Sequence, residues 1–209
     1  GALEQGGLIA QTVFGILVIM SVGTFYILFT KLIEQQKVIN QGKRVRATFW
    51  RSASLKEATA KLEKNSAYKQ IVDDGIKAQE EHGKLTDPVE AHDWLHGSLA
   101  RSEASINSSL GGGLAFLATV GSTSPFIGLF GTVIGIYRAL IKIGAAGQAS
   151  IDKVAGPVGE ALIMTAIGLG VAIPGVLLYN YLVRRNKVIN EKLRSFASDL
   201  QTYLVTKGK

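Results

Sequence analysis

Three long stretches of the chain are almost free of charged side chains, and stretches of ordinary polar composition lie between and after them. The apolar stretches correspond to residues 8–30, 114–143 and 155–183. Each is longer than the roughly 20 residues that an α-helix needs to cross the hydrocarbon layer of a membrane. Because backbone polar groups in lipid must be satisfied within the segment itself, each stretch is predicted to be a membrane-spanning helix.

A helix is also predicted to lead from the first polar stretch into the second span. Asp87 can cap its first turn, Pro88 suits the first helical position, and Glu90 can bond back to the cap. The next proline is Pro125. We therefore expect one long helix that continues from the cytoplasm into the second span, with the glycines at 111–113 as a soft point in it.

The C-terminal stretch, residues 184–209, carries an apolar stripe at helical spacing. Its members recur every three or four residues, while Lys and Arg occupy the other faces. Such a stripe must be covered, so the third span is expected to continue as part of a helical bundle, within one chain or between copies. The stripe consists of Ile189, Leu193, Phe196, Leu200 and Leu204.

The distribution of positive charge predicts how the chain lies in the membrane. Of the 23 Lys and Arg residues behind the net charge of +7, thirteen lie at 31–110 and seven at 184–209. Cytoplasmic segments of membrane proteins are enriched in these residues. The polar residues 31–113 and the C-terminal stretch are therefore predicted to be cytoplasmic, with residues 1–7 outside and 144–154 in a short outer loop. Basic residues beside the bilayer also contact anionic lipid headgroups, whereas nucleic-acid binding is not expected.

Composition and motifs exclude most conventional enzyme classes. The absence of cysteine excludes disulfides, Cys-ligated zinc, iron–sulfur clusters and a cysteine nucleophile. The sequence contains no phosphate-binding glycine loop and no serine nucleophile elbow. His92 and His96 lie four residues apart near Glu90, but two histidines without a third ligand are weak evidence for a metal. We therefore expect no catalytic residue, metal or cofactor.

The second and third spans each carry a stripe of small residues along one helix face. In both spans the members are spaced four, three, four and three residues apart. Small residues at this spacing let helix backbones approach closely in lipid, where no hydrophobic force drives helices together. The stripes are Gly121, Pro125, Gly128, Thr132 and Gly135 in the second span, and Ala161, Thr165, Gly168, Ala172 and Gly175 in the third.

Three polar side chains within the spans are candidate functional residues. Thr132 and Thr165 both lie about 15 Å below the outer end of the predicted hairpin, as judged from the helix rise. Their hydroxyls either bond backbone carbonyls and join helices, or line a polar pore. Glu160 is the one carboxylate within the three spans. It is expected either to handle protons or gate their passage, or to form an ion pair with Arg138 at the same level.

Around these residues the sequence resembles the ExbB/TolQ/MotA family of proton-channel subunits, most closely its ExbB and TolQ branches. The resemblance rests on TSPFIGLFGTV at 123–133, with GI at 135–136, and on EALIMTAIGL at 160–169, with AIPG at 172–175. The three-span order with a large insert extends it over nearly the whole chain. It implies an all-α inner-membrane protein of Gram-negative bacteria, with a periplasmic N-terminus and with spans that extend into a cytoplasmic helical bundle.

The resemblance also implies an assembly and a function. Such subunits form a homopentamer around a central pore that holds the helices of a single-span partner, ExbD, and the complex uses the proton gradient to energise TonB-dependent uptake of iron chelates and vitamin B12. Thr132 and Thr165 then correspond to the pore-lining threonines, and Glu160 to the glutamate of the third span. The main protonatable carboxylate is expected on the partner. TolQ-type service in outer-membrane integrity and a non-conducting scaffold stay open as alternatives.

The chain departs from the family pattern at two places. The family usually has Ala-Pro-Gly-x-x-Glu, whereas residues 155–160 read AGPVGE, so the proline is one residue nearer to Glu160. Arg138 and Lys142 also make the outer end of the second span more basic than expected for the family.

Overall fold

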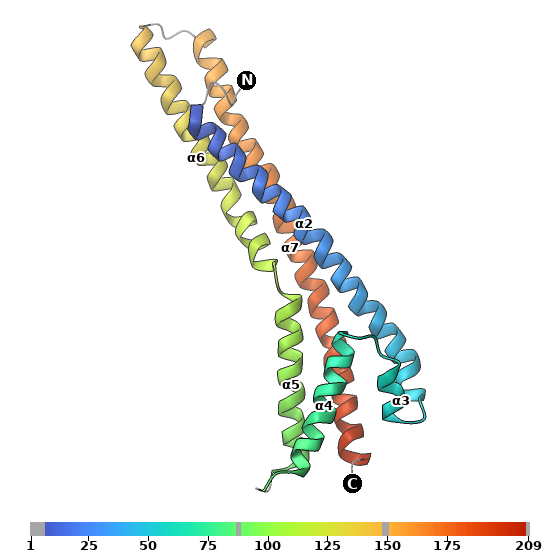
Figure 1. The fold of residues 1–209 in the computed structure, drawn as a ribbon. Coiled ribbons are helices and arrows are strands. Elements are labelled where there is room, and N and C mark those ends of the chain that lie inside the picture. The colour runs from blue at the N-terminus through green and yellow to red at the C-terminus, as the bar shows by residue number, and fades with distance from the viewer. Residues whose placement is uncertain (1–6, 87–88, 148–150, 208–209) are drawn as a thin grey trace. The chain divides into compact units, whose positions relative to one another are not determined.

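The computed structural model describes residues 7–86, 89–147 and 151–207, and every regular element within these residues is a helix (Figure 1). The elements are α2 (Gly7–Thr48), the 3-10 turn η1 (Phe49–Arg51), α3 (Leu55–Ala60), α4 (Ala67–Gly83), α5 (Ala91–Leu110), α6 (Leu114–Ala146) and α7 (Ile151–Lys207).

The chain divides into two compact units. The span unit consists of Gly1–Thr30 and Gly113–Tyr181, and the polar unit consists of Lys31–Gly112 and Leu182–Lys209. Helix α6 belongs to the span unit, whereas α3, α4 and α5 belong to the polar unit. Helices α2 and α7 contribute to both, so the chain passes between the units at three places.

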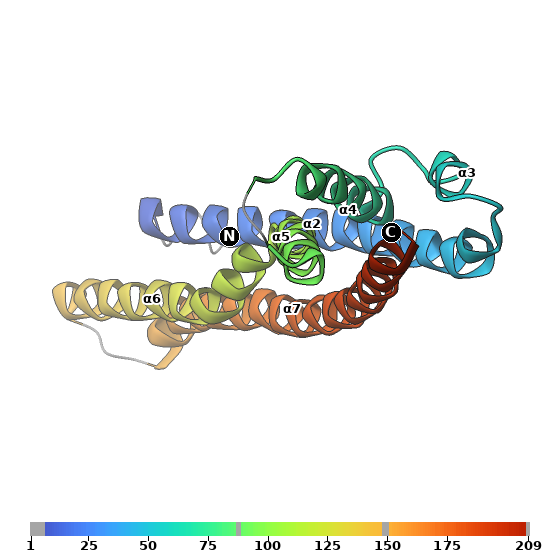
Figure 2. The same cartoon turned by 90° about the horizontal axis from the view of Figure 1, so that it is seen from below.

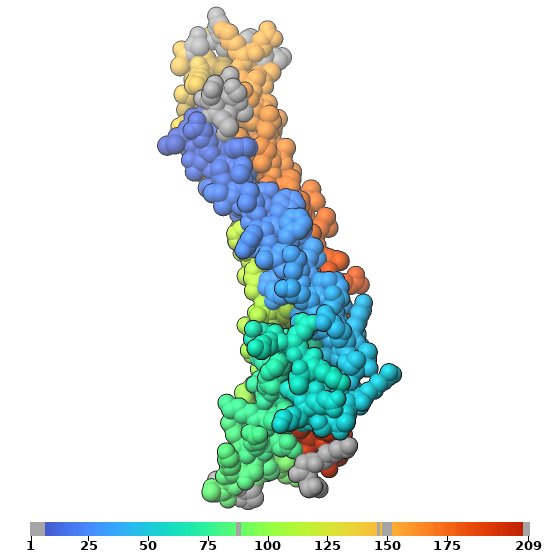
Figure 3. Space-filling model, turned by 45° about the vertical axis from the view of Figure 1, so that its right-hand side comes forward, coloured from blue at the N-terminus to red at the C-terminus, as the bar shows by residue number. Residues whose placement is uncertain are grey.

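Three helical segments are long and apolar enough to cross a membrane, namely Gly7–Arg51, Leu114–Ala145 and Asp152–Thr206. Each span expected from the sequence lies within one of them. Large apolar side chains such as Val22 and Tyr26 of α2 are exposed, and Figure 3 shows the surface of this helix in blue. Because soluble proteins rarely leave so much apolar surface exposed, the chain is a membrane protein.

The expected continuous helix from the polar stretch into the second span is wrong. Helix α5 ends at Leu110 and α6 begins at Leu114, with the glycines 111–113 between them. Gly113 has a φ of 85°, in the left-handed region that glycine adopts without strain. Successive glycines also lose more conformational entropy in a helix than other residues do. The predicted soft point is therefore a break.

Helix α5 begins later than the sequence predicts. Asp87 and Pro88, the expected cap and first helical residue, lie outside the described residues. The helix begins at Ala91, and Glu90 holds the N-cap position with an extended backbone (ψ 134°) instead of a place in the first turn. The backbone N–H of Trp94 donates to the Glu90 carbonyl at 3.0 Å. The first turn is thus closed by the backbone itself.

The apolar stripe of α7 is buried in the core of the polar unit, which confirms that it is covered. Its members pack in one cluster with side chains from α2, α3, α4 and α5. Figure 2 shows the ribbon of these helices from below. Aromatic rings extend the cluster, since the ring of Phe196 lies 5.3 Å from that of Phe49 and 5.1 Å from that of Tyr68. The buried members are Ile189, Leu193, Phe196, Leu200 and Leu204.

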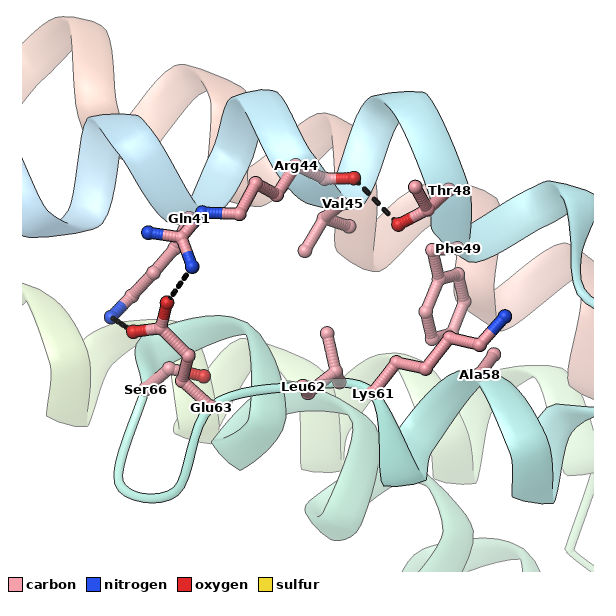
Figure 4. Close-up of a pocket in the computed structure, with 10 residues that line it drawn as sticks. All are labelled: Gln41, Arg44, Val45, Thr48, Phe49, Ala58, Lys61, Leu62, Glu63 and Ser66. Carbon is pink, nitrogen blue, oxygen red and sulfur yellow. Dashed lines mark hydrogen bonds and ion pairs between the residues drawn. The ribbon is translucent and has the colours of Figure 1, made fainter.

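A small cavity of about 40 Å³ lies between the end of α2 and the segment around α3 (Figure 4). Arg44 and Gln41 of α2 both bind the carboxylate of Glu63, with the Gln41 amide at 3.2 Å. Val45 and Leu62 line the space between the two segments. A volume of this size holds water molecules but no metabolite, so we assign it to packing.

Candidate functional site

In the span unit, α6 and α7 lie side by side (Figure 1), and the faces that carry their small residues pack against each other. A methyl group on Gly128 would lie 2.5 Å from the carbonyl oxygen of Met164 and 3.0 Å from the Cα atom of Gly168. A methyl group on Gly168 would lie 2.6 Å from the carbonyl oxygen of Ser124. Because carbon atoms do not approach backbone so closely, only glycine fits at these two positions without a shift of the helices.

Other members of the stripes follow the same line of contact. A methyl group on Gly135 would lie 2.9 Å from the Cβ atom of Ala161. Further along, one on Gly121 would lie 2.6 Å from a methyl carbon of Val176. The two predicted stripes therefore face each other within one chain. The remaining members are Gly175 against Gly121, the buried Ala172 and the half-buried Pro125.

The two threonines predicted at one depth are hydrogen bonded to each other. The hydroxyl of the buried Thr132 also lies 2.7 Å from the carbonyl oxygen of Ala161 on α7 and 3.1 Å from that of Gly128 on its own helix. Thr165 is half-buried. A hydroxyl has one hydrogen and two lone pairs. When Thr132 donates to Ala161, it can therefore accept the hydrogen of Thr165.

This geometry bears on the two explanations that the sequence left open for the threonines. The contacts of Thr132 with Ala161 and Thr165 join α6 to α7 within one chain, so helix joining is present. A hydroxyl pair can also orient its dipoles toward a passing charge. Pore lining by Thr132 and Thr165 stays a prediction.

Glu160 is half-buried and lies directly before Ala161 on α7. Among the described residues it has no hydrogen bond or ion pair. The guanidinium of Arg138, its expected partner, lies close to Gly7 of α2, where a methyl group would be 2.7 Å from Nη1. The ion pair with Arg138 therefore stays a prediction. A role of Glu160 in handling protons or gating their passage likewise stays a prediction.

Helix α2 also packs against this part of the span unit, which the sequence analysis missed. Val13 and Leu17 are buried against Met164 of α7. Gly131 lies next to Thr132 but outside the predicted stripe, and a methyl group there would be 3.1 Å from Val13 Cγ1. This extra glycine was the available signal, because the four-three spacing of the stripe does not account for it.

The polar unit contains a separate ionisable cluster. Burial raises the pKa of the Glu103 carboxyl above its usual range, while the charges of Arg194 and His96 partly oppose this effect. The Arg194 Nε atom lies 3.8 Å from Glu103 Oε2. All three side chains line a groove of about 600 Å³ between α5 and α7.

The two histidines considered as metal ligands lie on the surface of α5. The ring centroids of His92 and His96 are 6.4 Å apart. In the described part of the chain, no group of three or more His, Cys, Asp or Glu residues is arranged to hold a metal ion.

A model of the MotA/TolQ/ExbB proton channel family matches residues 63–195, which include both threonines and Glu160. The chain belongs to this family. It is 38% identical over 200 residues to the biopolymer transport protein ExbB of Xanthomonas campestris pv. campestris, covering 91% of this chain and 79% of that protein. It is 36% identical over 208 residues to ExbB of Neisseria meningitidis, with 97% and 94% covered. The Tol-Pal system protein TolQ of Haemophilus influenzae is 31% identical over 207 residues, with 96% and 90% covered.

These similarities confirm the resemblance on which the sequence analysis relied. The chain is a membrane protein of a bacterial proton channel family, which is not a known enzyme family.

Proposed function

We propose that this chain is the inner-membrane subunit of a proton-driven motor that energises TonB-dependent transport across the outer membrane. The observation that carries the proposal is the hydrogen bond between Thr132 and Thr165, because it joins two polar side chains of the spans inside the segment that the family model matches. The relatives named ExbB, at 36–38% identity over most of the chain, favour this branch of the family.

The proposed assembly is a homopentamer around a central pore. The pore holds the helices of an ExbD-type single-span partner, and the complex acts on a TonB-type protein. The N-terminus is periplasmic, and the polar unit is cytoplasmic because it carries most of the Lys and Arg residues. Those that lie next to the spans contact anionic lipid headgroups.

In the proposed mechanism, proton passage at a carboxylate of the partner changes the partner's contacts with the pore lining. Thr132 and Thr165 supply hydroxyl dipoles to that lining, and Glu160 tunes or gates the passage. Neither threonine can carry a charge, so their role is to solvate and orient.

The test replaces the chromosomal copy in the host with Glu160→Gln or Thr165→Val. We expect uptake of a labelled iron chelate to fall to the level seen when an ionophore collapses the proton gradient, while the subunit still co-purifies with its partner. Thr12→Val is the matched control, because this exposed threonine of α2 bonds a carbonyl of its own helix at 2.7 Å. Wild-type uptake in both site variants would refute the proposal.

A non-conducting scaffold predicts a different pattern in the same assay. Its requirement is the close contact of α6 and α7, so Gly168→Leu would abolish uptake together with assembly. Glu160→Gln and Thr165→Val would then leave uptake intact.

A TolQ-type role in outer-membrane integrity is the second candidate, and similarity to TolQ proteins favours it. One such relative, TolQ of Haemophilus influenzae, is similar over nearly the whole chain. Mass measurement of the detergent-extracted complex separates the two roles, because it gives the identity of the co-purified partner together with the number of subunits.

A further inference from the structure

Four hydrogen bonds of the polar unit lie close to the places where the chain passes to the span unit. The three crossings lie at residues 30/31, 112/113 and 181/182. Within five residues of each crossing, a group on the polar-unit side is bonded to a group from another helix. We call this set the crossing collar. It consists of Lys31, Gln35, Ser109, Leu110, Leu182 and Asn186.

Two buried amides form the centre of the crossing collar. The side-chain amide of Gln35, which is fully buried on α2, donates to the carbonyl oxygen of Leu182 at 3.0 Å and to Asn186 Oδ1 at 2.6 Å. Asn186 on α7 is also buried, and its Nδ2 donates to the carbonyl oxygen of Leu110 at 3.0 Å. The bonds therefore run from α2 through α7 to the end of α5.

A helix leaves its last carbonyl groups without intrahelical donors, and at the end of α5 backbone and side-chain groups supply them. The backbone N–H of Gly112 donates to the Ser109 carbonyl at 3.2 Å. Asn186 supplies one donor to Leu110, and the ammonium group of Lys31 lies 3.2 Å from the carbonyl oxygen of Ser109. A cation at this position also complements the negative end of the helix dipole. Lys31 is held in place by Glu34, whose Oε2 lies 2.9 Å from Nζ. Side chains of α2 and α7 thus cap the C-terminal end of α5, directly before the break.

We propose that the crossing collar is a positioning element, which fixes the axial register of α2, α5 and α7 where they leave the polar unit. Leucine at the same places would cover apolar surface, but apolar contacts tolerate sliding, whereas these donors and acceptors meet in one register only. A slide of one helix turn would separate the bonded atoms by about 5.4 Å. Its role in transport rests on the proposed function: register at the crossings is required for proton-driven work, whereas folding and assembly do not depend on it.

The deciding variant replaces both central amides, Gln35→Leu with Asn186→Leu. Removal of one amide would leave the other buried and unpaired, whereas replacement of both removes the two side-chain amides together. The backbone carbonyls of Leu110 and Leu182 lose these donors in the double variant. The matched control is Asn107→Leu with Asn190→Leu, because this amide pair also joins α7 to α5, as Asn186 does, but at 2.5 Å in an exposed position.

Register is measured by the distance between spin labels at Lys37→Cys on α2 and Ser108→Cys on α5, two exposed positions. The chain has no cysteine of its own, so the labels attach only there. Labelled chain is diluted into unlabelled chain so that pairs within one chain dominate. Uptake of a labelled iron chelate in the host is the second measurement, and co-purification with the partner is the third.

We expect the double leucine variant to fold and to co-purify with its partner, with a broadened or shifted label distance and at least a tenfold loss of gradient-driven uptake. The control should keep the wild-type distance and uptake. A double variant with the wild-type distance, or with normal uptake despite a changed distance, overturns the proposal. If that variant does not fold, Gln35→Met is judged by the same two measurements. If wild-type chain itself shows no gradient-driven uptake, the proposed function fails, and the label distance still decides whether the collar fixes register.

Discussion

Gly128 and Gly168 face each other across the contact of α6 and α7, and a methyl group on either one would reach backbone atoms of the opposite helix. In lipid, helices associate through close packing and hydrogen bonds, so contact at this distance is a main source of stability for the helix pair. The same contact sets the distance at which the Thr132 hydroxyl can reach α7.

The first prediction concerns this contact. Gly168→Ala should destabilise the protein by about 1–3 kcal/mol, because the added methyl overpacks the backbone. Gly170→Ala, two residues further along α7, should be neutral or stabilising by roughly 0.5–1 kcal/mol, since a methyl group there meets open space. Thermal unfolding of the purified protein in detergent measures both. An equal loss in the two variants would show that the close contact does not decide stability.

A second prediction follows from the buried hydroxyl of Thr132. Thr132→Val removes the donor to the Ala161 carbonyl and should cost about 0.6–1.7 kcal/mol, the range found for hydrogen bonds between membrane helices. Thr132→Ser keeps the hydroxyl and should lose less. The difference between the unfolding free energies of these two variants gives the contribution of the hydroxyl group to stability. If serine is no better than valine, the bond to α7 contributes nothing to stability.

The helix break provides a third prediction. Gly113→Ala should destabilise the protein by roughly 1–2 kcal/mol, the penalty for an L-residue in the left-handed region. A methyl group there would also lie 3.2 Å from Ile27 Cγ2. Gly15→Ala, where a methyl group meets nothing within 4 Å, is the control. If the Gly113→Ala variant has the same unfolding temperature as the wild type, the break between α5 and α6 tolerates another backbone conformation.

A fourth prediction concerns Glu103 and pH. Burial raises the pKa of this carboxyl in the folded chain above the ordinary value of 4.5 that it takes in the unfolded chain. A raised folded pKa means that stability falls as the pH rises through it, whereas below the unfolded pKa both states are protonated and no stability is lost. Glu103→Gln should therefore raise the unfolding temperature near neutral pH, and the gain should disappear below about pH 4.5.

Glu80→Gln is the control for this pH effect, because Glu80 is an exposed carboxylate of the same unit. It should change the unfolding temperature little at any pH. A gain for Glu103→Gln that persists in acid would point to packing instead of ionisation.

The sequence predicted those parts of the fold that depend on local pattern. The four-three spacing of small residues within each span, around Gly128 in one and Gly168 in the other, indicated two close-packed helix faces. The structure places these two faces in contact. The stripe from Ile189 to Leu204 indicated a covered helix face, which is buried. Both patterns repeat with the helix period, so a single segment suffices to recognise them.

The features that the sequence did not predict depend on residues far apart in the chain. Gln35 and Asn186 are separated by 151 positions, and each looks like an ordinary surface amide until the fold buries both. The break before α6 was predicted only as a soft point, because a run of glycines lowers helix stability but does not say which residue takes positive φ. Long-range side-chain pairing and the backbone conformation of single residues are set by the folded chain as a whole, so no local sequence pattern reveals them.

The hydroxyl of Thr132 carries a single hydrogen but lies within reach of three acceptors, on Gly128, Ala161 and Thr165. Rotation about one side-chain bond moves that hydrogen from a carbonyl of α6 to one of α7, while all heavy atoms stay in place. The direction of the hydroxyl dipole can therefore change without any movement of the helices. The closely packed helix contact thus contains one polar group whose orientation the packing does not fix.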